Sequence, residues 1–203
     1  MKENVSTIDI SDLVNYDLNS PKSAEVIKRI HNACSNTGFF TIVAHAVPAK
    51  LINYILIFSA NFFGSSSKKK LKIVSQKWNK KNSNIYRQYF PSSVNGKEGL
   101  DIGDSTLKNS MYEILRKERF KYLNLKTFLD NKSILIINKY FDCLFSLGKL
   151  LFKSIVKSFE ADINIVNKAF VRPKTLTTLR FNYYPKQKKP VEISEDYGER
   201  LGC

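Results

Sequence analysis

The segment from Ser20 to Phe62 constrains the fold most, because two helix-type patterns flank a short strand-type run. Ser20 can cap a helix and Pro21 suits the first helical position. Apolar residues then recur at helical spacing and predict one buried stripe: Val26, Ile27, Ile30, Ala33 and Cys34. Residues 39–43, which follow Gly38, are β-branched or aromatic and predict a buried strand. Pro48 opens a second helix, whose inner face is expected to hold Leu51, Ile52, Ile55, Phe58 and Phe62.

The rest of the chain alternates between periodic and irregular segments. Residues 5–14 predict a short strand followed by a turn, whereas residues 77–110 show no sustained period and predict a long irregular segment. A helix from about Ser133 to Phe159 is apolar on more than one side, so we expect it to be heavily buried. A short helix is expected at 162–169 and a strand at 176–184.

Composition excludes several classes of protein. The apolar fraction of 43% and the aromatic fraction of 12% indicate a folded chain of 203 residues. The three cysteines are an odd number without close spacing, so we expect no disulfide framework and a reducing, cytoplasmic compartment. The longest apolar region, Ile134 to Phe159, holds too many polar residues for a membrane span, and we expect no membrane association.

The net charge of +15 permits two interpretations. The charge can be a lysine-rich bias spread over solvated faces, or it can mark a non-catalytic basic module that binds RNA or an anionic surface. The second interpretation is the less expected one, and we do not expect nucleic acid as a partner. It uses a lysine-rich segment with Trp78 and Tyr86 as possible stacking groups. The lysines are Lys68, Lys69, Lys70, Lys72, Lys77, Lys80 and Lys81.

Several segments, in chain order, resemble one enzyme family. They are IDIS (8–11), NTGFFTIVAHAVP (36–48), the Phe62-Phe63 pair with the lysine-rich stretch to Lys72, IYRQYFP (85–91), GKEGLDIG (96–103) and LRFNYYP (179–185). Together they resemble the isopenicillin N synthase-like, iron- and 2-oxoglutarate-dependent dioxygenases, including their non-haem dioxygenase N-terminal region. Ala44 and Ala46 depart from the Asn and Gly that this family usually places around the histidine at position 45.

The resemblance implies an α+β fold and an oxidoreductase. We expect a non-haem dioxygenase N-terminal domain over residues 1–120. Residues 121–203 are then expected to hold a long helix, packed on an incomplete double-stranded β-helix (jelly roll). The parent reaction is the oxidation of a small organic substrate, coupled to decarboxylation of 2-oxoglutarate.

The resemblance also implies a site. The family holds Fe(II) with two histidines and a carboxylate, the first two ligands arriving as His-x-Asp. This chain has only His31 and His45, and neither is followed by x-Asp, so no metal ligand is assigned. Asn182 and Tyr184 match positions that help to hold 2-oxoglutarate. Arg87 is either a substrate-binding residue that points into the cavity or one more exposed cation.

The sequence stops at about the point where the metal-bearing strand of the family would begin. We therefore expect a truncated oxygenase that is inactive by itself, binds neither Fe(II) nor 2-oxoglutarate tightly, and has a complementary C-terminal half as its partner. The strand at 176–184 would then lack barrel neighbours, which favours association between chains.

Overall fold

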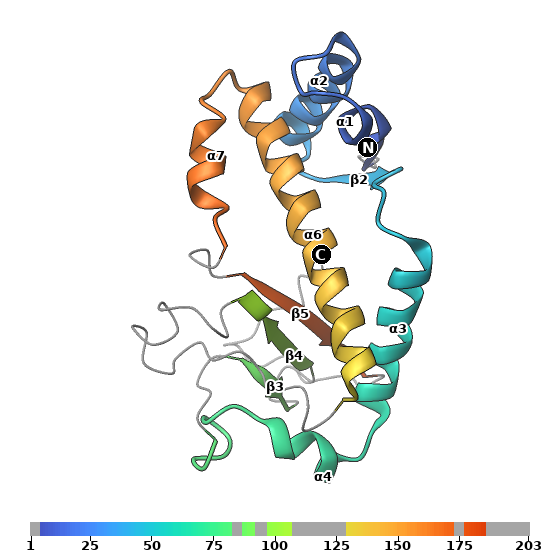
Figure 1. The fold of residues 1–203 in the computed structure, drawn as a ribbon, viewed down its shortest axis with the longest axis vertical. Helices are drawn as coiled ribbons and strands as arrows, with labels where there is room; N and C mark the ends of the chain where they lie inside the picture. Colours follow the sequence, from blue (N-terminus) through green and yellow to red (C-terminus); the bar gives the residue numbers. More distant parts are fainter. Residues whose placement is uncertain (1–4, 83–86, 92–96, 107–128, 173–176, 186–203) are drawn as a thin grey trace, which may run out of the picture.

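A computed structural model describes residues 5–82, 87–91, 97–106, 129–172 and 177–185, which form a mixed helix and strand structure. The long helix α6 (Asn131–Ser158) runs through the molecule (Figure 1). One end of α6 lies beside the N-terminal elements and the other end lies beside a three-stranded sheet (Figure 1). The predicted combination of helices, short strands and one long helix is confirmed.

The N-terminal elements surround a small core of their own. Strand β1 (Ser6–Asp9) pairs in parallel with β2 (Phe40–Val43), and α1 (Ser11–Asn15) and α2 (Pro21–Asn36) lie between them in the chain. The Ser20 hydroxyl accepts a hydrogen bond from the Ser23 amide at 3.1 Å, which confirms the predicted cap. The buried side chains of this core are Ile8, Ile10, Leu13, Val26, Ile27, Ile30 and Ala33.

Two local predictions in this region are wrong. The predicted turn after β1 is the helix α1. The strand β2 is not buried as predicted: Phe40 and Ile42 are partly buried against the N-terminal core, whereas Phe39 and Val43 are 61% and 45% exposed. Among the described residues β2 pairs with β1 alone.

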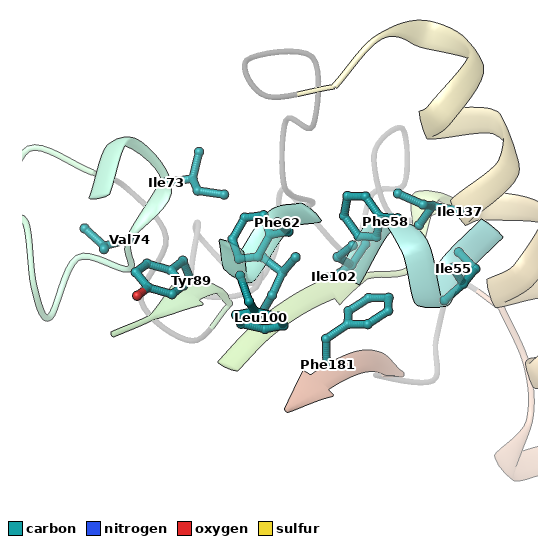
Figure 2. Packing of buried hydrophobic residues seen from close by; sticks show 11 residues of the cluster. Ile55, Phe58, Phe62, Ile73, Val74, Tyr89, Leu100, Ile102, Ile137 and Phe181 are labelled. Carbon is teal, nitrogen blue, oxygen red and sulfur yellow. The ribbon is translucent and has the colours of Figure 1, made fainter. Parts of the chain in front are cut away.

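The larger core lies between α3 and the three-stranded sheet. Helix α3 (Ala49–Gly64) is followed by the short helices α4 (Ser67–Lys70) and η1 (Leu71–Ile73). Figure 2 shows that aromatic residues of α3 meet aliphatic and aromatic residues of the sheet. The rings of Phe58 and Phe181 lie 5.7 Å apart, edge to face.

The sheet has the order β3-β4-β5 and is antiparallel: β3 (Gln88–Phe90), β4 (Glu98–Gly103) and β5 (Thr178–Tyr183). Strand β5 confirms the strand predicted from LRFNYY, although residue 176 lies outside the described part. The irregular structure predicted for residues 77–110 is wrong at β3 and β4. Strand β4 is buried at five consecutive positions, so it lacks the apolar–polar alternation by which strands are recognised.

Helix α6 is less buried than its sequence indicated. Its buried residues are Ser133, Ile137, Phe141 and Ser154, whereas Leu135 and Phe152 are 69% and 49% exposed. The predicted heavy burial is wrong, because the described neighbours of α6 cover only part of its surface. The short helix α7 (Asn164–Ala169) is confirmed. No helix of the described segments is long and apolar enough to cross a membrane.

The predicted division at residue 120 falls within residues 107–128, which lie outside the described part. The pairing of β4 with β5 joins a strand from each side of that division. Closure of a jelly roll stays a prediction.

Candidate functional site

The sheet has an apolar face and a polar face. Side chains alternate along a strand, so Leu179 and Phe181 of β5 join the larger core together with Leu100 and Ile102 of β4. The intervening residues define what we call the polar face: Gly99, Asp101, Gly103, Thr178, Arg180 and Asn182. The candidate site is on this polar face.

Asn182 and Tyr184, the predicted 2-oxoglutarate residues, lie at the C-terminal end of β5. Asn182 is paired in register with Gly99 and is exposed, and Tyr184 is 56% exposed just beyond the strand. In contrast, Tyr183 stacks on Phe63 with a ring separation of 5.2 Å. Neither Asn182 nor Tyr184 is therefore packed in the core, and both side chains are accessible to a ligand. Their role in holding 2-oxoglutarate stays a prediction.

Arg87 is buried, with only 2% of its surface exposed, so the interpretation as one more exposed cation is wrong. Its guanidinium donates a hydrogen bond to the carbonyl oxygen of Thr177 at 3.1 Å. The group also lies against Gly103: a Cβ at that position would be 1.6 Å from Nη1 of Arg87. Glycine at position 103 thus makes room for the guanidinium, and the predicted contact of Arg87 with substrate stays a prediction.

An ion pair that sequence reasoning missed lies on the polar face. Arg180 donates to Asp101 through Nε at 2.7 Å and through Nη2 at 2.6 Å. The Asp101 side chain is 2% exposed and the Arg180 side chain 56% exposed. The hydrogen bond from Arg180 to Asp101 raises the pKa of the guanidinium, against the opposing effect of burial. The spacing of Arg180 and Asn182 in LRFN indicates that both lie on one face of a strand, because side chains two residues apart point to the same side. That spacing does not identify Asp101 as the partner of Arg180, because the two residues are 79 positions apart.

A second cluster joins the end of β4 to α6. Arg172 donates to the buried Asp104 through Nε at 2.6 Å and Nη2 at 2.5 Å, and to Asp142 of α6 through Nη1 at 2.6 Å. Burial by itself would raise the pKa of Asp104, but hydrogen bonds from Arg172 and Thr106 outweigh it and hold the pKa below its usual value. The arrangement is a fixed connection between elements, with no donor set for a metal.

The lysine-rich segment does not present all of its charges to solvent, because one of its lysines is buried. Lys70 is 5% exposed, donates to the Phe63 carbonyl at 2.9 Å and pairs with Glu98 at 2.6 Å. Tyr89 also donates to Glu98, at 2.8 Å; burial and the nearby carboxylate raise the pKa of its phenol. Trp78 is 44% exposed with the Lys77 amino group 5.3 Å from its ring, and Tyr86 lies outside the described residues.

The two histidines have structural surroundings. His45 Nδ1 accepts a hydrogen bond from the Val47 amide at 3.1 Å, within a turn in which Ala44 and Ala46 have φ of 56° and 59°. The ring of His31 lies 4.6 Å from that of Phe159. No group of three His, Cys, Asp or Glu residues in the described ranges could hold a metal ion. The described residues therefore do not fit an iron site.

Comparison with known proteins places the chain in a family. The family model for the non-haem dioxygenase in morphine synthesis N-terminal matches residues 5–124, more than half of the chain. The 2-oxoglutarate-dependent dioxygenase tropC of Talaromyces stipitatus is 23% identical over 99% of this chain and 65% of its own length. Protein DOWNY MILDEW RESISTANCE 6 of Arabidopsis thaliana is 32% identical over 66 residues, 32% of this chain and 19% of that protein.

Solved structures show the same fold. The full-length Neurospora crassa T7H in complex with alpha-KG has a TM-score of 0.65 at 20% identity, over 91% of this chain and 54% of that chain. JOX2 in complex with 2OG, Fe and JA has a TM-score of 0.63 at 17% identity, over 91% of this chain and 49% of that chain. The chain thus spans about half the length of these structures. It belongs to the non-haem dioxygenase N-terminal family and is related to the Fe(II)- and 2-oxoglutarate-dependent dioxygenases.

Proposed function

We propose that the chain is the N-terminal part of an Fe(II)- and 2-oxoglutarate-dependent oxygenase that oxidises a small organic substrate. The observation that carries the proposal is the placement of Asn182 and Tyr184. Both match the family's cosubstrate positions, and both are accessible at the end of β5 instead of packed in the core. The amide of Asn182 and the phenol of Tyr184 supply hydrogen-bond donors suited to the oxygens of 2-oxoglutarate.

The iron ligands lie outside this set of residues in our proposal. The 203 residues include two histidines, and neither begins a His-x-Asp sequence. This chain alone is therefore inactive, and a complementary C-terminal half of the oxygenase supplies the metal site. A reducing, cytoplasmic compartment is part of the same proposal, since Fe(II) and the free Cys34 and Cys143 are both compatible with it.

The RNA-binding alternative has no observation in its favour. Lys70 of its lysine-rich segment is held in a buried ion pair, and the similar protein tropC is a 2-oxoglutarate-dependent dioxygenase. We do not carry it forward as a second function.

Titration of 2-oxoglutarate into the chain, followed by amide NMR, tests the proposal. We expect shifts centred on Asn182 and Tyr184 with a weak Kd, on the order of millimolar, because the metal that would bind the same ligand is supplied elsewhere. Asn182→Ala and Tyr184→Phe should weaken the binding, and Asn32→Ala on the exposed side of α2 is the matched control.

Two results would contradict the proposal. One is an absence of shifts at β5 at saturating ligand. The other is a calorimetric titration without oxygen that finds a stoichiometric iron site of micromolar affinity in this chain.

A further inference from the structure

We propose that Arg180 recognises a carboxylate group on the substrate of this oxygenase, so that the substrate is a small organic acid. The inference rests on the proposed function, and it comes from the geometry of the Asp101–Arg180 pair on the polar face.

The guanidinium of Arg180 is held in a fixed orientation. Asp101 accepts from Nε at 2.7 Å and from Nη2 at 2.6 Å, which fixes both the plane and the rotation of the group. An arginine has five N–H donors, so this pairing leaves others on the side away from Asp101. The side chain is 56% exposed, so those donors are accessible.

The position of Arg180 places it beside the proposed cosubstrate site. Arg180 and Asn182 are two residues apart on the same face of β5, a separation of about 7 Å along a strand. A small molecule bound to Arg180 would therefore lie next to a cosubstrate held at Asn182. A carboxylate is the ligand class that matches the planar fork of an arginine, and the fixed fork reduces the entropy lost on binding.

The competing explanation is that Arg180 only neutralises Asp101 and joins β4 to β5. Asp101 and Arg180 are direct cross-strand neighbours, so such a structural role is compatible with the register. The two explanations differ in what they require: a structural pair tolerates replacement by a neutral hydrogen-bonded pair, whereas carboxylate recognition does not survive it.

Ligand-observed fluorine NMR with 4-fluorobenzoate tests the inference, with 4-fluorobenzamide as the neutral probe of the same shape. The wild-type chain should bind the benzoate in preference to the benzamide. The double variant Asp101→Asn/Arg180→Gln should weaken benzoate binding about tenfold and leave the benzamide unchanged. Arg180→Lys, which keeps the charge and loses the fork, should give an intermediate affinity. Arg29→Gln removes an exposed arginine on α2 and should have no effect.

Three results would overturn the inference. The first is equal benzoate affinity in the wild type and the double variant. The second is a loss of benzoate affinity in Arg29→Gln as large as the loss in the double variant. The third is a loss of 2-oxoglutarate binding in Arg180→Lys as large as the loss in Asn182→Ala. The last would assign Arg180 to the cosubstrate. If Arg180-dependent benzoate binding persists while Asn182→Ala leaves 2-oxoglutarate binding unchanged, the carboxylate site stands and the proposed function fails. Thermal unfolding of each variant beside the wild type verifies that the variant is folded. If the double variant is unfolded, the benzoate affinity of Arg180→Lys still tests the inference.

Discussion

At the scale of single residues, the turn around His45 shows why the family sequence has its usual form. Ala44 and Ala46 both have left-handed backbone, with φ of 56° and 59°. Asn and Gly adopt this conformation more readily than other residues, because the Cβ of an ordinary L-residue then crowds the following carbonyl. The departures that the sequence showed at these positions are therefore strained sites in this chain.

Replacing Ala46 by Gly should stabilise the chain. Relief of left-handed strain, roughly 1–2 kcal/mol, exceeds the extra backbone entropy of glycine, so the expected gain is about 0.5–1 kcal/mol. Urea unfolding measures the difference. Ala60→Gly, at an exposed position within α3, is the matched control and should cost about 1 kcal/mol. Destabilisation in both variants would contradict the assigned φ at position 46.

Replacing Gly103 by Ala should destabilise the chain by about 1–3 kcal/mol, the usual cost of overpacking. The added Cβ would be 1.6 Å from Arg87 Nη1, so the buried guanidinium must move. Gly148→Ala in α6 is the control, because a Cβ there meets nothing within 4 Å and alanine favours a helix. Equal stability of Gly103→Ala and wild type would show that Arg87 does not lie across this glycine.

At the scale of elements, two ion-pair clusters connect segments that are distant in sequence. Arg172 joins Asp104, at the end of β4, to Asp142 on α6. Lys70 of α4 joins the carbonyl of Phe63 on α3 to Glu98 on β4. These connections fix the sheet relative to its covering helices, so the polar face has a defined geometry.

The Arg172 cluster should make stability depend on acid pH. The pKa of Asp104 is lowered in the folded state, so its stabilisation is fully present above the unfolded pKa near 3.8. It is lost as pH falls through the lower, folded pKa. Unfolding in urea between pH 5 and pH 2 should therefore show a steeper loss of stability in wild type than in Asp104→Asn. Asp142→Asn, whose side chain is 55% exposed, should retain most of the slope. Identical slopes in wild type and Asp104→Asn would contradict this origin.

Removal of Lys70 should cost more than removal of the whole pair. Lys70→Met leaves Glu98 poorly solvated without its cation, at an expected cost of about 3 kcal/mol. The double variant Lys70→Met/Glu98→Gln removes both charges and should recover part of that loss. Lys69→Met, the exposed neighbour, is the control. A double variant that is less stable than Lys70→Met alone would argue against a buried pair.

At the scale of the whole molecule, the described sheet is open at β5. Within the described residues β5 pairs only with β4, and its polar face carries exposed side chains. A strand with an unpaired edge can template association between chains. This geometry agrees with the proposal that a complementary half of the oxygenase contributes the rest of the barrel.

We expect the chain alone to associate despite its charge of +15. Size-exclusion chromatography at physiological salt should give oligomers whose share increases with protein concentration, because edge pairing is bimolecular. A single sharp monomer peak across a range of concentrations, together with cooperative unfolding, would contradict this expectation.

The sequence by itself determined the local features of this protein. The Ser20 cap, the stripe on α2, the strand at LRFNYY and the order of family segments each depend on residues close together in the chain. The tertiary structure alone decided which charges are buried and what they contact. Arg172 meets Asp104 across 68 positions and Arg180 meets Asp101 across 79, so no local pattern specifies either pair. Strand β4 was missed for the same reason: its burial on both faces depends on distant elements, and that burial removes the alternation by which a half-exposed strand is recognised.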